Sequence, residues 1–74
     1  MKLHIDINGE ARSFETSGSF TLTDLLDRLA IKTDRVAVEL NRDIVPRDRW
    51  AQTALQEGDR LEVVHFVGGG LDES

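Results

Sequence analysis

Three consecutive glycines, Gly68, Gly69 and Gly70, are the residues of this sequence with the clearest chemical potential. Glycine has no Cβ, so a glycine run can extend through a narrow passage, and its carbonyl is open to a nucleophile. Glycine is also common where ordered structure stops, which is the simpler interpretation. Two observations favour a chemical role: the run follows an apolar segment without a spacer, and it comes after enough sequence for a small domain.

The other candidate groups do not form a catalytic or metal-ligating set. The chain has two histidines, His4 and His65, and no cysteine, so it has neither disulfides nor the thiolates of a zinc site. A lone histidine on a strand is usually packed or solvated, and we assign catalysis to neither. The sequence shows no pairing of a nucleophile with a base, which argues against an enzyme.

The composition indicates one small domain, since 74 residues suffice for a single core. The net charge of −5 comes from interspersed acidic and basic residues, whereas nucleic-acid-binding surfaces cluster basic ones. No secretory apolar region follows Met1, and no apolar run is long enough to span a bilayer. We therefore expect a cytoplasmic protein, monomeric when alone, that binds neither nucleic acid nor a membrane.

The N-terminal segment predicts a β-hairpin. Residues 2–7 alternate apolar and polar side chains, which is typical of a half-buried strand. Asn8 and Gly9 both tolerate positive φ, as a tight hairpin turn requires. The return strand is expected at residues 11–16, with Phe14 directed inward, and one face of the hairpin needs a covering layer.

A helix supplies that layer. Thr21 can cap its start with Asp24 three residues later, an approximate capping box, and Thr23 is a competing cap. The helix is expected to end at about residues 30–32. Its buried stripe is expected to consist of Leu22, Leu25, Leu26 and Leu29.

The second half of the chain predicts further strands. Residues 35–40 place Val36, Val38 and Leu40 on one face. The elements that follow are expected to be a turn at 41–43, a short strand at 44–45 ended by Pro46, an irregular or single-turn crossing at 47–53 anchored by Trp50, a turn at 57–59 and a final strand at 60–67.

This order of elements predicts an α+β fold of the β-grasp (ubiquitin-like) type, with one helix packed across a mixed sheet of four or five strands. The first and last strands must pair in parallel at the sheet centre, because the hairpin leaves the last strand no other buried neighbour. The domain is expected to cover residues 1–67, and residues 68–74 to form a flexible glycine tail with a four-residue extension.

Several motifs resemble the ThiS family of sulfur carriers in thiamin biosynthesis. The resemblance covers residues 1–70, and Thr21 with Leu25 and Leu26 matches the family's helix start. The more specific pieces are VELN at 38–41, IVPR at 44–47 with Trp50, Gly58-Asp59, and LEVVHFVGGG at 61–70.

The resemblance implies a carrier cycle and a co-substrate rather than a catalyst. A ThiF-type adenylyltransferase would activate the terminal glycine carboxylate with ATP, and sulfur transfer would convert the acyl-adenylate to a thiocarboxylate. A ThiG-type thiazole synthase would then take the sulfur. No cofactor is expected on the chain itself. Carriers for molybdopterin, cysteine or secondary metabolites, ubiquitin-like modifiers and non-covalent β-grasp interaction modules remain alternatives.

Strand alternation predicts where partners would bind. If Leu61 and Val63 face the helix, then Glu62, Val64 and Phe66 share the outer face. Exposed Val64 and Phe66 beside the tail would form a docking patch, as related β-grasp proteins use this face. The alternative is that Phe66 folds back onto the edge of the domain.

The chain departs from the family's pattern by continuing after Gly70 with Leu-Asp-Glu-Ser at 71–74. Adenylation needs a free carboxylate, so Gly70 cannot be loaded while it is held in a peptide bond. Three interpretations remain open. A protease, for example of the JAMM type, removes the extension after Gly70 or Gly69; the extension is an artificial addition; or the protein keeps only a binding function.

Overall fold

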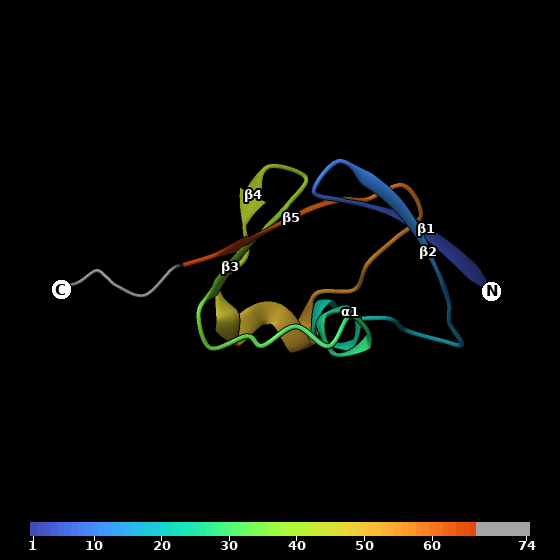
Figure 1. Cartoon of the computed structure of the whole chain (residues 1–74). Helices are drawn as coiled ribbons and strands as arrows, with labels where there is room; N and C mark the ends of the chain where they lie inside the picture. The colour runs from blue at the N-terminus through green and yellow to red at the C-terminus, as the bar shows by residue number, and fades with distance from the viewer. Residues whose placement is uncertain (67–74) are drawn as a thin grey trace, which may run out of the picture.

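The computed structural model describes residues 1–66. A five-stranded sheet in the order β2-β1-β5-β3-β4 is covered on one face by a helix and a 3-10 helix (Figure 1). The elements are β1 (Lys2–Ile7), β2 (Glu10–Glu15), α1 (Leu22–Arg28), β3 (Val36–Leu40), β4 (Asp43–Ile44), η1 (Arg47–Gln52) and β5 (Arg60–His65). This arrangement is the predicted β-grasp fold.

The predicted hairpin is confirmed. Asn8 (φ 52°) and Gly9 (φ 82°) form a two-residue turn with positive φ at both positions. Because the turn is this tight, Glu10 already pairs with Ile7, so β2 begins one residue earlier than predicted. Phe14 points inward and is 6% exposed.

The predicted parallel pairing of the first and last strands is also confirmed. β1 and β5 lie side by side in the sheet centre, with Asp6 opposite Arg60 and Ile7 opposite Leu61. β5 pairs on its other side with β3, antiparallel, from Leu40–Leu61 to Val36–His65. β5 therefore has a neighbour on both sides only along its first half.

Helix α1 begins as predicted and ends earlier. Thr21 is the N-cap: its side chain accepts from the Asp24 backbone N–H, and the Asp24 carboxylate accepts from the Thr21 backbone N–H. The helix ends at Arg28, because Ala30 takes a left-handed conformation (φ 58°). The backbone N–H of Ala30 donates to the carbonyl oxygen of Asp27, and that of Ile31 donates to the carbonyl oxygen of Leu26, which is the pattern of a Schellman motif.

The core lies between the sheet and the two helical elements. Leu22, Leu25 and Leu26 of α1 are at most 1% exposed. From the sheet, Ile5, Val38 and Leu61 are equally buried. Leu29 of the predicted stripe is only partly buried and packs against this cluster.

Trp50 anchors the crossing after β4, as predicted. The crossing is a 3-10 helix, η1, and Trp50 is 5% exposed. Its indole N–H donates to the Val45 carbonyl oxygen at 2.9 Å. The Arg47 guanidinium lies over the ring, 4.7 Å from its centroid, and donates to the Thr33 carbonyl oxygen.

The boundaries of three predicted strands, β3, β4 and β5, shift. The turn before β4 contains only Asn41 and Arg42, both with positive φ, so β4 comprises Asp43 and Ile44 rather than 44–45. β3 begins at Val36, one residue later than predicted. β5 ends at His65, and Val67 lies outside the described residues.

Candidate functional site

The strand that precedes the glycines carries the candidate site. Gly68, Gly69 and Gly70, like the extension after them, lie outside the described residues, so their predicted role stays a prediction. β5, the strand before them in the sequence, lies at the centre of the sheet between β1 and β3 (Figure 1).

The inward side of β5 is as predicted. Leu61 is 1% exposed and Val63 6%, and both belong to the core that packs against α1. Alternation then places Glu62, Val64 and Phe66 on the outer face, and all three are exposed.

An apolar patch occupies the outer face at the end of β5. Val64 is 51% exposed and Phe66 58% exposed, so Phe66 does not fold back onto the domain. Val64 lies opposite Ala37 of β3. The Phe66 backbone N–H donates to the Arg35 carbonyl oxygen at 2.9 Å, which continues the ladder by one more pair. We call Ala37, Val64 and Phe66 the outer-face patch.

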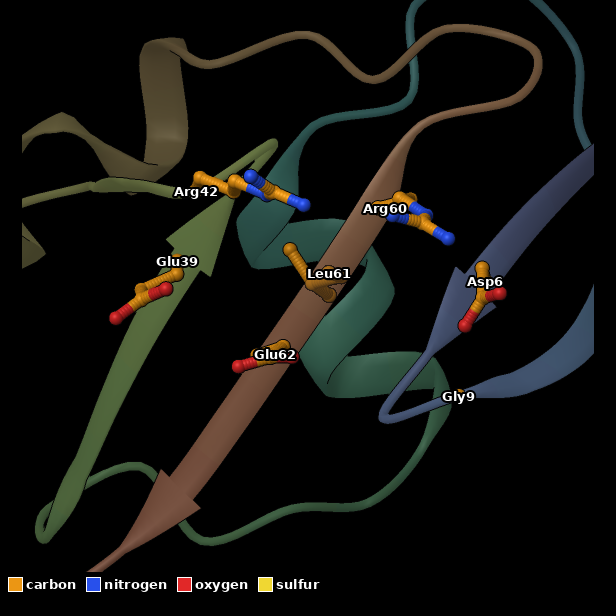
Figure 2. A pocket seen from close by; sticks show the side chains of 7 residues that line it. All are labelled: Asp6, Gly9, Glu39, Arg42, Arg60, Leu61 and Glu62. Atoms are coloured by element: carbon orange, nitrogen blue, oxygen red, sulfur yellow. The ribbon is translucent and has the colours of Figure 1, made fainter.

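A charged pocket of about 360 Å³ lies on the same face, beside the patch. Figure 2 shows Arg42 and Arg60 at one end of it, with Glu39 and Glu62 further along β3 and β5. Glu39 and Glu62 are direct cross-strand partners, an arrangement of like charges that destabilises a sheet. The lining residues are Asp6, Gly9, Glu39, Arg42, Arg60, Leu61 and Glu62.

The pocket itself was not predicted, and of its charged residues only Glu62 was among the predicted site residues, as part of the outer docking face. Asp6 lies on β1, Arg60 on β5, and Glu39 and Arg42 on β3 and the turn after it, and these three parts of the chain meet through strand pairing. Alternation alone puts Asp6 and Glu39 on the polar side of their strands. The signal that could have joined them is the predicted parallel pairing of the first and last strands.

The two histidines have different surroundings. His4 Nδ1 lies 3.0 Å from a carboxylate oxygen of Glu57, and both side chains are exposed. His65 follows Val63 on the helix side of β5 and is exposed. Within residues 1–66, no group of three or more histidine, cysteine or acidic side chains has the geometry to hold a metal ion. In the same range, no helix has the length and apolar character needed to cross a bilayer.

Comparison with known proteins gives relatives of two kinds. A thiazole synthase of Paramagnetospirillum magneticum is 48% identical over 68 residues, which cover 92% of this chain and 20% of that protein. The sulfur carrier protein ThiS of Bacillus subtilis is 40% identical over 50 residues, which cover 68% of this chain and 76% of that protein. The chain thus spans about a fifth of the length of the thiazole synthase that it resembles.

Solved structures and the family model agree with these relatives. The crystal structure of the thiamine biosynthesis protein ThiS from Geobacter metallireducens matches with a TM-score of 0.80 and 30% identity, covering 92% of this chain and all of that one. The ThiS family model matches residues 5–70. The fold, the relatives and the match of the family model over most of the chain agree with one another. The chain belongs to the ThiS family of sulfur carriers in thiamin biosynthesis.

Proposed function

We propose that this chain carries sulfur as a thiocarboxylate on its glycine tail for thiazole formation. A ThiF-type adenylyltransferase joins the Gly70 carboxylate to the adenylyl group of ATP and releases pyrophosphate. Sulfur at the oxidation state of sulfide, supplied by a donor, then attacks the acyl carbon, displaces AMP and leaves the thiocarboxylate. The observation that carries this proposal is the family match itself, which runs through all three glycines and ends at Gly70.

The chemistry of the tail explains its composition. A carboxylate that reacts inside a partner's active site must arrive on an extended, narrow segment, which glycine permits. The chain's own residues then need only to bind the partner and present the tail. The chain acts as a co-substrate, and ATP is bound by the partner.

A ThiG-type thiazole synthase is the proposed acceptor of the sulfur. Two thiazole synthases, from Paramagnetospirillum magneticum and Magnetococcus marinus, contain a segment 48% and 44% identical to nearly the whole of this chain. A carrier joined to its acceptor in one polypeptide supports the same partnership here. The outer-face patch with Glu62 is the proposed docking surface, because it exposes two large apolar side chains next to the tail.

Loading at Gly70 requires a free carboxylate at that residue. We therefore include in the proposal the removal of residues 71–74, for example by a JAMM-type protease, before adenylation.

Intact-mass spectrometry of the protein from its native host tests this function. The expected form ends at Gly70 and shows the mass gain of one oxygen replaced by sulfur. In parallel, ATP–pyrophosphate exchange is measured with a ThiF-type enzyme and chains ending at Gly70 or Ser74, and only the first is expected to react. A chain that stays uncleaved and unloaded during growth without thiamin would contradict the proposal, and glycine remnants on lysines of other proteins would favour a ubiquitin-like modifier.

A further inference from the structure

The side chain of Asn8 takes the place of backbone hydrogen bonds between β1 and β5. The Asn8 backbone N–H donates to the Leu61 carbonyl oxygen at 2.8 Å, as a parallel ladder requires. The next hydrogen bonds along β5 are made by the Asn8 side-chain amide: Oδ1 accepts from the Val63 N–H at 2.8 Å, and Nδ2 donates to the Val63 carbonyl oxygen at 3.3 Å. With φ at 52°, the Asn8 backbone turns into the hairpin, and β1 goes no further.

The C-terminal half of β5 therefore has an open edge on the side of β1. Residues 60, 62, 64 and 66 direct their backbone groups to the β3 side, as the bonds from Asn41 to Arg60 and from Phe66 to Arg35 show. The alternate residues face the β1 side, where Leu61 and Val63 are paired with Asn8. His65 is next in this series. Within residues 1–66, its N–H and carbonyl have no hydrogen-bond partner on that side.

Figure 1 shows the same arrangement in space: β5 continues past the β1–β2 hairpin with β3 on one side only. His65 is exposed, and the Asn8 side chain marks the end of the paired stretch. An edge of this kind accepts an added strand, since it offers a donor and an acceptor at ladder spacing.

We propose that an extended strand of the ThiG-type thiazole synthase adds to the sheet here, pairing with the His65 backbone just beyond the bonds between Asn8 and Val63. The synthase is the occupant because two thiazole synthases contain a segment similar to nearly the whole of this chain within one polypeptide. This proposal rests on the proposed carrier function and specifies how the partner binds. The edge continues the outer-face patch, because Val64 and Phe66 are the residues directly before and after His65, and Val64 lies with it in β5. A partner that covers those two side chains also excludes water from the His65 N–H and carbonyl, which must then find new partners.

An extended backbone meets this requirement best, because it supplies both an acceptor and a donor in line with the strand. The next sequence positions lead directly to Gly68, so strand addition at His65 would fix the direction in which the tail enters the partner. Asn8 has a positioning role, since its amide ends the internal ladder at Val63 and holds this part of β5 in register.

The variant His65→Pro tests the proposal. Proline removes the N–H on the open side, while every β3–β5 bond remains, because those bonds belong to the neighbouring residues. The matched control His65→Ala removes the imidazole and keeps the N–H. Affinity for a purified ThiF-type adenylyltransferase and a ThiG-type thiazole synthase is measured by titration calorimetry. His65→Pro is expected to weaken binding to the synthase about tenfold or more, and His65→Ala to leave it unchanged.

Equal affinities of His65→Pro and wild type for the synthase would overturn strand addition, as would an equal loss of affinity in His65→Ala. A loss of affinity for the adenylyltransferase alone would assign the edge to that enzyme and overturn the proposed occupant. Amide hydrogen exchange in the wild-type chain gives a second measurement that does not depend on the folding of the proline variant. The His65 amide is expected to exchange at least about tenfold more slowly in the complex with the synthase than in the free chain. Exchange as fast as in the free chain would contradict the proposal.

The failure of the carrier function has a different signature. If the wild-type chain ending at Gly70 neither binds the two enzymes nor supports ATP–pyrophosphate exchange, both proposals fall. If it is adenylated normally while His65→Pro binds as tightly as wild type, only strand addition is wrong. Concentration-dependent dimerisation of the wild-type chain that His65→Pro abolishes would assign the edge to a second copy and overturn the partner strand.

Discussion

Both oxygens of the Glu57 carboxylate bind His4. Oε1 accepts from the His4 backbone N–H at 2.9 Å, and Oε2 lies 3.0 Å from Nδ1 of its ring. The Gly58 N–H returns a bond to the His4 carbonyl oxygen at 2.9 Å. Together these contacts join the middle of β1 to the turn that precedes β5, and so set where the last strand enters the sheet.

The Glu57 contact predicts a contribution to acid stability. The hydrogen bond from the His4 backbone is the main cause that lowers the pKa of Glu57 below 4.5; desolvation opposes it, and the His4 side chain adds to it. Because the pKa is lower in the folded state, the stabilisation is present above pH 4.5 and is lost as the pH falls through the folded-state pKa.

The change Glu57→Gln is therefore expected to reduce the fall in melting temperature between about pH 6 and about pH 3. Circular dichroism melts at several pH values provide the measurement. Glu10→Gln, at an exposed position of β2, is the control for the loss of one negative charge. Parallel pH profiles of wild type and Glu57→Gln would show that the contact contributes nothing.

Trp50 is expected to contribute through packing more than through its indole N–H. Trp50→Phe removes the hydrogen bond to Val45 and should lower the free energy of unfolding by about 1 kcal/mol. Trp50→Ala empties the anchor site and should lower it by about 3–5 kcal/mol. Urea denaturation followed by circular dichroism separates the two, and equal losses would mean that the hydrogen bond dominates.

The capping box of α1 gives a second stability prediction. Thr21→Ala removes the acceptor for the Asp24 N–H, so the free energy of unfolding should fall by about 1 kcal/mol. Thr21→Ser keeps a hydroxyl and should cost only a few tenths of that amount. A Thr21→Ala protein as stable as Thr21→Ser in urea would rule out the cap as a stabilising contact.

Ala30 is the position where a substitution should stabilise the protein. Its φ of 58° belongs to the left-handed region, which glycine adopts without the steric cost of a Cβ. Ala30→Gly is therefore expected to raise the free energy of unfolding by about 0.5–1 kcal/mol, measured in urea. Ala54→Gly, at a residue with no such strain, is the comparison and should show no gain.

The outer-face patch predicts a loss of partner binding without a loss of stability. Phe66→Ser and Val64→Ser remove exposed side chains, so melting temperatures should change little, while affinity for a ThiG- or ThiF-type enzyme falls about tenfold or more. Ile44→Ser removes an apolar side chain that is 72% exposed at the sheet edge, and it is the control. A similar loss of affinity in all three variants would mean that binding depends on the apolar character of the surface in general and not on the outer-face patch.

Local features of this protein follow from the sequence alone. The alternation in β1, the Asn8-Gly9 turn, the Thr21–Asp24 cap and the leucines of α1 all depend on residues a few positions apart, where steric preference and short-range hydrogen bonds decide the conformation. The parallel centre of the sheet was also predictable, because only one arrangement buries the last strand.

Contacts between distant residues required the tertiary structure. His4 and Glu57 are 53 positions apart, and Asn8 and Val63 are 55 apart. The local pattern predicts that Asn8 takes a positive φ, but it does not show that the side chain of Asn8 also bonds to β5. Nor does it show that Asp6, Glu39 and Arg60 line one pocket. These relationships depend on strand register, which the packing of the whole core determines. That register also leaves the His65 edge open in front of the glycines.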